Sequence, residues 1–237
     1  MKRIFLTFAA LAAAAFTTPA LADTITVDPS DVGTTYTLNY NGFVDNESNT
    51  VDGLSSTITL TLTAASDTAY TFAYTVENTS SDPVTGSRVS GFSLNTDPTI
   101  SSASSTGAFS YATVGSTYPN GIGAVDVCFK DASTGSCAGG GGGGLTLGES
   151  GSGTFTLNFA DATDSITLSD FYVRYQSITG VSGVTSASGA GTVSSTSGGT
   201  AVPEPGMMVL FALGVIAILI GQRRSFPMRR ALRTAIA

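Results

Sequence analysis

Polar and apolar residues alternate with a period of two through the middle of the chain. The clearest segments are residues 57–62, where threonine alternates with aliphatic residues, and residues 70–76 and 154–159, where aromatic residues take apolar positions. Such alternation predicts β-strands with one face on a core and one in water. A strand covered on both faces is expected at 171–175, and weaker strands are expected at 24–27, 36–40, 88–94 and 124–129.

Turn residues separate these segments, and no stretch between them shows a helical period of 3.6. One expected turn is Tyr118-Pro119-Asn120-Gly121. Eight or nine short strands with such punctuation predict an all-β fold, an antiparallel, jelly-roll-like β-sandwich over residues 23–180. Residues 181–201 are mostly Ser, Thr, Gly and Ala, which predicts a final weak strand followed by a flexible spacer.

The first 22 residues have the three parts of a secretory signal peptide. Lys2-Arg3 is the positive start, residues 4–16 are apolar, and Ala20-Leu21-Ala22 is a small-x-small cleavage pattern. We therefore expect cleavage before Asp23. A retained membrane anchor is the alternative, but the apolar run is short for a span.

The other end of the chain combines a proline motif, an apolar run and arginines. Pro203-Glu204-Pro205 precedes fourteen uncharged residues, 207–220, and Arg223-Arg224 follows them. As a helix this run is about 21 Å long, short of the ~30 Å hydrocarbon core. The arginines would stay in the cytoplasm by the positive-inside rule, so the β domain would face outward.

This order of features resembles the PEP-CTERM sorting signal. Pro203, Glu204 and Pro205 correspond to its motif, residues 207–220 to its helix and Arg223-Arg224 to its basic end. The resemblance implies temporary retention in the inner membrane of a Gram-negative bacterium and cleavage near Pro-Glu-Pro by an exosortase. The basic tail, residues 225–237, departs from the pattern, because such tails usually stop soon after the arginines. An uncut single-pass anchor is the alternative.

Charge and composition exclude several kinds of chemistry. The chain has no histidine, which rules out Ser-His-Asp and Cys-His catalysis and imidazole metal ligands. A pI of about 4.3 argues against nucleic acid as a partner. Residues 23–202 carry sixteen acidic and three basic side chains, a net charge of −13. Of these basic residues, Arg88 and Arg174 lie in expected strands, where we expect each to pair with a carboxylate.

Cys128 and Cys137 are the two cysteines of the chain. In an exported protein they are expected to form a local disulfide, worth about 2–3 kcal/mol for so short a loop. Free thiols or a metal site are the alternatives, although two ligands fall short of a tetrahedral set. The following glycines, 139–144, lead to no Lys-Ser/Thr, so they predict a flexible loop rather than a phosphate cradle. Close approach of another backbone is the alternative.

A narrower resemblance rests on three segments. The Cys-(eight residues)-Cys-Ala-Gly run, with Ser87-Arg88-Val89-Ser90-Gly91-Phe92 and Phe171-Tyr172-Val173-Arg174-Tyr175-Gln176-Ser177, looks like the cistern family of PEP-CTERM proteins. These segments span most of the secreted region. The resemblance implies no particular activity.

One acidic loop is the best calcium candidate. Asp45, Glu47 and Asp52 lie in an oxygen-rich stretch, but this stretch lacks the spacing and final glutamate of an EF-hand. A solvated acidic surface is the favoured interpretation. No resident cofactor is expected.

Together these features predict an exported, non-enzymatic surface or extracellular-matrix protein. Its expected partners are the Sec export machinery, an exosortase, the inner membrane for a time, and an exopolysaccharide matrix. The alternative is an adhesin module that binds Ca²⁺ or a glycan.

Overall fold

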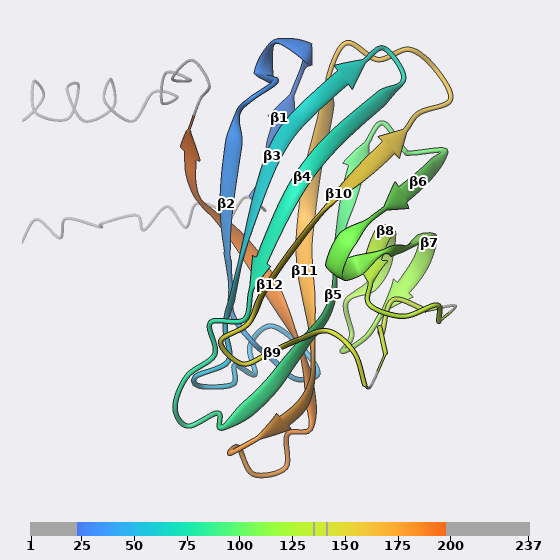
Figure 1. Cartoon of the computed structure of the whole chain (residues 1–237). Coiled ribbons are helices and arrows are strands. Elements are labelled where there is room, and N and C mark those ends of the chain that lie inside the picture. Colours follow the sequence, from blue (N-terminus) through green and yellow to red (C-terminus); the bar gives the residue numbers. More distant parts are fainter. Residues whose placement is uncertain (1–22, 135, 141, 198–237) are drawn as a thin grey trace, which may run out of the picture. The chain divides into compact units, whose positions relative to one another are not determined.

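The chain folds as an all-β domain in the computed structural model, which describes residues 23–134, 136–140 and 142–197 (Figure 1). All strand pairs there are antiparallel. The strands are β1 (Ile25–Val27), β2 (Thr35–Tyr40), β3 (Ser56–Ser66), β4 (Ala69–Glu77), β5 (Gly86–Asp97), β6 (Ser102–Ser105), β7 (Tyr111–Tyr118), β8 (Gly123–Lys130), β9 (Leu145–Thr146), β10 (Ser150–Asn158), β11 (Ile166–Thr179) and β12 (Ser186–Ser197). Two 3-10 turns, η1 (Pro29–Asp31) and η2 (Gly107–Phe109), complete the elements.

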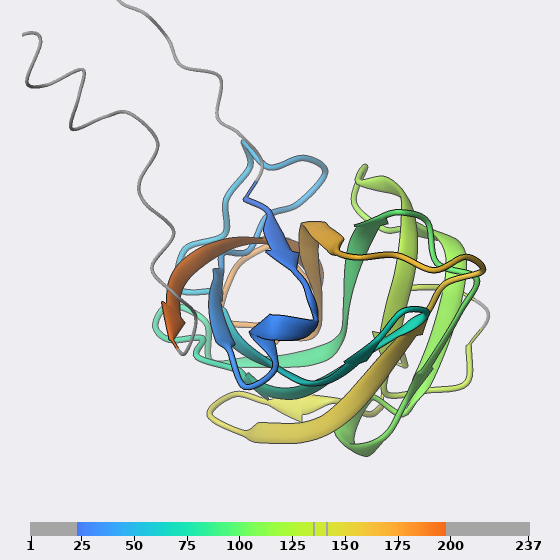
Figure 2. The same cartoon turned by 90° about the horizontal axis from the view of Figure 1, so that it is seen from above.

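The strands form one sheet that wraps around a core. Their order is β6-β10-β4-β3-β2-β12-β11-β5-β8-β7, with β1 beside β11 and β9 beside β5. The two end strands, β6 and β7, contact each other without pairing, and the strands surround the interior when seen from above (Figure 2). The predicted antiparallel all-β fold is confirmed, whereas the sheet is one nearly closed surface rather than two separate layers.

Strand β12 makes the sheet continuous. Its first part, Ser186–Ala190, pairs with β11, and its second part, Gly191–Ser197, pairs with β2. A strand that changes partners in this way forms a corner between two sheet directions. The sequence boundary at residue 180 is therefore wrong: the domain continues to residue 197, and the final weak strand is a full member of the sheet.

The alternation seen in the sequence sets the two faces of the sheet. Along β3 the aliphatic residues Ile58, Leu60 and Leu62 are buried, and the intervening threonines are partly exposed. Threonine hydroxyls on neighbouring strands bond to each other, as in the pair Thr35–Thr61 at 2.9 Å. Cross-strand pairs of this kind stabilise a sheet beyond its backbone ladder.

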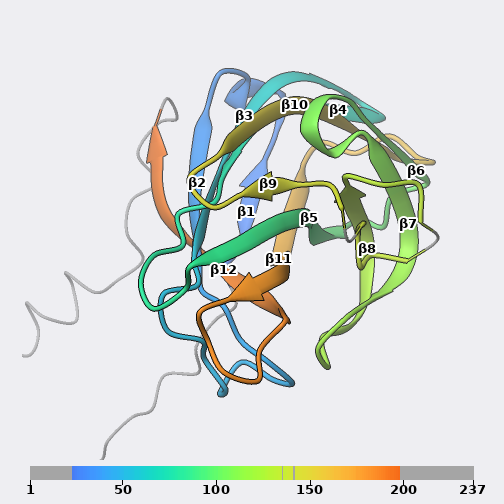
Figure 3. The same cartoon turned by 60° about the horizontal axis from the view of Figure 1, so that its bottom comes forward.

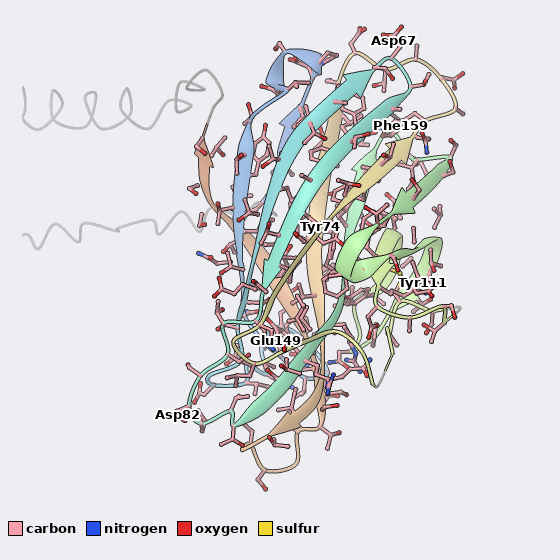
Figure 4. The ribbon with its side chains drawn as sticks, in the orientation of Figure 1. Asp67, Tyr74, Asp82, Tyr111, Glu149 and Phe159 are labelled. Carbon is pink, nitrogen blue, oxygen red and sulfur yellow. A yellow bond between two sulfur atoms is a disulfide. The ribbon has the colours of Figure 1, made fainter. Side chains whose placement is uncertain are left out.

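Aromatic rings fill the centre of the main core. Phe129 stacks on Phe155 with ring centroids 4.6 Å apart, and Phe92 lies 5.0 Å from Phe129. Tyr74, labelled in Figure 4, joins this group, and its hydroxyl donates to Thr106 O at 2.7 Å. The core thus joins strands that are distant in the sequence.

A second, smaller cluster lies on the opposite face of β8 and β11. Side chains alternate along β8, so Phe129 points to the main core while Cys128 and Lys130 point away from it. Tyr172 joins this second cluster with Tyr118, at a ring-centroid distance of 6.0 Å. Loops cover this face, which explains why β5 and β11 are buried on both sides.

The weaker strands expected from the sequence are all present, as β1, β2, β5 and β8. Strands β6, β7 and β9 were not predicted, because their short or exposed segments carry little apolar alternation. Two-residue β9 lies beside β5, as the view in Figure 3 shows. These strands are specified by their neighbours in the sheet and not by their own sequences.

Candidate functional site

Most of the predicted processing residues lie outside the described residues. Ala20 and Ala22 of the signal peptide are among them, as are Pro203-Glu204-Pro205 and Arg223-Arg224 of the sorting motif, the helix predicted at 207–220 and the basic tail. Asp23, the expected first residue of the mature chain, is described. Its Oδ2 accepts a hydrogen bond from the backbone N–H of Val193 at 2.7 Å.

The predicted disulfide between Cys128 and Cys137 is present, with a Cα–Cα distance of 5.7 Å. Both cysteines are fully buried in the second cluster. The bond ties the chain after β8 down onto the outer face of the sheet. A disulfide leaves no thiol for the alternative metal site.

The two ends of the glycine run, Gly139 and Gly144, pack tightly against β5. A Cβ built at Gly139 would lie 2.6 Å from Ser90 O, and one at Gly144 would overlap the carbonyl oxygen of Val89. Gln176 Nε2 and Ser90 Oγ both donate to the carbonyl of Ala138, just before the run. The alternative of close backbone approach is therefore correct for these glycines, because only a residue without a side chain fits there.

Lys130 lies inside the loop that the disulfide closes. Its side chain is 1 % exposed, and its ammonium donates to the carbonyl oxygens of Thr134 and Ser136, the second at 2.8 Å. Burial lowers the pKa of this ammonium, and the nearby carboxylate of Asp131 acts in the opposite direction. The ammonium thus organises the loop by binding its carbonyls.

The arginines are not held as the sequence predicted. Arg88 donates to the carbonyl oxygens of Gly142 and Gly143, and Arg174 donates to Asn120 Oδ1 and to Ala187 O. None of these hydrogen bonds goes to a carboxylate, so the predicted pairing of each arginine with an acidic side chain is wrong. Backbone and amide oxygens take the place of acids, since the acidic residues lie mainly in exposed turns.

The calcium candidate does not assemble as a carboxylate cluster. Asp45 and Glu47 are exposed in the loop after β2, and Asp52 lies in a turn before β3. Within the described residues, no group of three or more Asp, Glu, Cys or His side chains is placed to hold a metal ion. Asp45 instead has φ 63°, and its backbone carbonyl lies against Gly121.

A cavity of about 370 Å³ lies between this loop and the β7–β8 turn. Its lining combines two aromatic side chains with amide, hydroxyl and carboxylate groups. The lining residues are Phe43, Asn46, Glu47, Ser48, Asn120, Gly121, Ile122 and Tyr172. Its volume is within the ~300–1,000 Å³ of small-molecule pockets.

Asn120 is held in one orientation at the edge of the cavity. Its Oδ1 accepts from Arg174 Nη1 at 3.2 Å, and its Nδ2 donates to the carbonyl of Phe43 at 3.3 Å. Since a guanidinium only donates and a carbonyl only accepts, these partners decide which end of the amide is which. Phe43 is itself fixed, because it exchanges backbone hydrogen bonds with Ser188 of β12.

Arg174 holds Asn120 in place from a buried position. Its side chain is 8 % exposed, and its Nε is buried without a hydrogen-bond partner in the described residues. Burial lowers the pKa of the guanidinium. A buried cation next to Asn120 polarises the amide and makes its N–H a stronger donor.

Two residues beside the cavity have left-handed backbone. Asp45 and Asn120 have positive φ angles of 63° and 60°, a region that Asp and Asn adopt more readily than other residues with a side chain. Burial raises the pKa of the Tyr172 hydroxyl, and the carboxylates of Asp170 and Glu47 raise it further.

Several tyrosine side chains are buried in the domain. Burial raises the pKa of Tyr40, Tyr118 and Tyr175 well above the ordinary value. Tyr175 shares a 2.7 Å hydrogen bond with Ser56. These groups stay protonated near neutral pH, because their pKa values lie above the ordinary value.

Of the cavity residues, the sequence singled out Glu47, as part of the calcium candidate, and did not connect it with the others. The sequence pattern placed Asn120 in a turn, Tyr172 in a strand and Arg174 in an ion pair. The available signal was weak: an asparagine-rich loop and a Tyr-Pro-Asn-Gly turn, 70 residues apart in the chain. Only pairing of distant strands brings them together.

Comparison with known proteins gives one match. Residues 201–224 match the model of the PEP-CTERM protein-sorting motif. No curated protein and no solved structure matches the chain. No helix among the described residues is long and apolar enough to cross a bilayer. The motif implies that the chain is exported, held in the membrane for a time and processed by an exosortase.

Proposed function

We propose that the chain is a non-enzymatic surface or extracellular-matrix protein whose β domain is carried out of the cytoplasm, tethered and then released or attached by an exosortase. The match at residues 201–224 is the observation that carries this proposal. The chemistry of processing belongs to the exosortase, and this chain is its substrate. The narrower assignment to the cistern family remains a prediction.

The physical basis of tethering is a mismatch in length. As a helix, residues 207–220 would be about 21 Å long, against a hydrocarbon core of ~30 Å. Arg223 and Arg224 hold one end of this segment at the cytoplasmic surface. A short, one-sided anchor suits a substrate that is retained only until it is cut.

The composition of the exported region supports a surface role. Residues 23–202 have a net charge of −13, which keeps neighbouring copies apart and soluble at the cell surface. The absence of histidine from the whole chain removes the commonest acid–base catalyst. The disulfide between Cys128 and Cys137 suits an oxidising compartment outside the cytoplasm.

Mass spectrometry of the mature protein tests this proposal. In a strain with an active exosortase, we expect a chain that begins at Asp23 and ends near Pro203-Glu204-Pro205. A strain without the exosortase, or a Pro203→Ala/Glu204→Ala/Pro205→Ala variant, should keep the tail and stay in the membrane fraction. A C-terminus at Ala237 in the active strain would overturn the proposal.

A further inference from the structure

We infer that the cavity between residues 43–48 and 119–122 binds a neutral sugar ring of an uncharged polysaccharide. The inference rests on the proposed function only for location, since a surface protein meets such polymers outside the cell. It adds a binding site that neither the sorting motif nor the fold requires.

The lining of the cavity matches the two kinds of surface on a sugar ring. Tyr172 offers an aromatic side chain that can cover the apolar C–H face of the ring. Around it, Asn46, Asn120 and Glu47 offer donors and acceptors for hydroxyl groups, each of which both donates and accepts. The alternation of one ring-sized apolar contact with several polar groups is typical of small-ligand sites.

Two of the amides are already oriented before any ligand arrives. Arg174 and the carbonyl of Phe43 fix Asn120, which leaves one N–H of its Nδ2 without a partner among these contacts. Asn46 Oδ1 accepts from the backbone N–H of Ser48 at 3.1 Å, which leaves the Nδ2 of Asn46 as a donor. Groups held in place in this way lose little conformational entropy when they bind.

Charge selects among sugars. Glu47 lines the cavity, and its carboxylate is close enough to Tyr172 to affect the pKa of that hydroxyl. The −13 charge of residues 23–202 adds a general repulsion of anions. Neutral hexoses therefore fit the site, whereas uronic acids are repelled by Glu47.

Saturation-transfer NMR on the mature exported protein tests the inference directly. The probes are D-glucose, D-galactose, D-mannose and N-acetyl-D-glucosamine, with D-glucuronate as the charged counterpart and CaCl₂ alone as an ion control. We expect saturation transfer to at least one neutral sugar, with a dissociation constant on the order of millimolar, and less than a tenth of that affinity for glucuronate.

Three substitutions at the cavity and one control substitution locate the binding. Tyr172→Ala and Glu47→Ala should each weaken binding of the neutral sugar at least tenfold. Glu47→Gln should keep neutral binding within a few-fold and raise the affinity for glucuronate. Tyr111→Ala, a matched loss of an exposed tyrosine on β7 (Figure 4), should leave binding unchanged.

Several results would overturn the inference. These are no saturation transfer to any neutral sugar, stronger binding of glucuronate than of neutral sugars, or equal losses in Tyr111→Ala and Tyr172→Ala. Because Glu47 is exposed, its variants remain informative where Tyr172→Ala disturbs folding. A failure of the sugar-binding inference would not affect the proposal of exosortase processing, because processing is measured separately, by the mass of the mature chain.

Discussion

The carboxylate of Asp23 accepts a hydrogen bond from the backbone N–H of Val193, 170 positions later in the chain. This contact places the expected start of the mature protein on the last strand before the sorting motif. It also shows that β12 is part of the folded domain. Only residues 198–202 separate this strand from Pro203, so the folded sheet ends close to the expected processing site.

Removing β12 should prevent the sheet from closing. A chain that stops after Thr185 loses the partner of both β2 and β11 and exposes the edges of both strands. We expect this truncation to aggregate or to lose its cooperative urea transition, whereas a chain that stops after Ser197 keeps it. Near-ultraviolet circular dichroism and urea titration measure the difference. Equal midpoints for the two chains would show that β12 is dispensable.

Two glycines of the same run should respond differently to alanine. Gly144 has φ 84°, and a Cβ there would overlap Val89 O, so Gly144→Ala should destabilise the domain by about 1–3 kcal/mol. Gly142 has no atom within 4 Å of its Cβ position, so Gly142→Ala is the matched control. Its free energy of unfolding should stay the same or rise by up to about 1 kcal/mol. Urea midpoints measure both, and equal effects would contradict the close packing of the run.

Loss of the disulfide should lower stability without removing the fold. Cys128 and Cys137 are nine positions apart, and closing so short a loop is worth about 2–3 kcal/mol. The Cys128→Ala/Cys137→Ala variant should unfold at a lower urea concentration by that free energy. A reducing agent should lower the midpoint of the parent protein and leave the double variant unchanged. A shift in the double variant would assign the effect to something other than this bond.

Stability should fall steeply above pH 10. The hydroxyls of Tyr40, Tyr118 and Tyr175 have pKa values raised by burial, so the folded state keeps protons that the unfolded chain releases near its ordinary pKa of 10.0. Each such group contributes stability that is complete below pH 10 and is lost as the pH rises above it. Three together lower the free energy of unfolding by up to about 4 kcal/mol per pH unit.

Lys130 changes the pH dependence of stability in the opposite direction, but only below its ordinary pKa of 10.5. Its folded pKa is lowered, so its contribution rises with pH and is complete by that point. Urea titrations between about pH 9 and 11 measure the net slope. Tyr175→Phe should reduce the slope by about 1.4 kcal/mol per pH unit. An unchanged slope in Tyr175→Phe would contradict the prediction.

The local features of the fold were readable because they depend on neighbouring residues. Alternating Thr and apolar residues placed β3 and β10, and compartment and spacing predicted the Cys128–Cys137 bond. The partners of Arg174 were not readable. The oxygen atoms that accept hydrogen bonds from Arg174 belong to Asn120, 54 positions earlier in the chain, and to Ala187, which lies in a strand predicted to be weak.

By itself, the sequence determined the β class, the sorting motif and the disulfide, because hydrophobic period, a linear motif and the spacing of two cysteines are properties of short segments. The tertiary structure alone decided that the sheet nearly closes through β12 and that residues 43–48, 119–122 and Tyr172 share a cavity. Strand partners and register arise from burying many faces at once. Pairing between residues as far apart in the chain as Thr35 and Ser197 is a choice that no local pattern encodes.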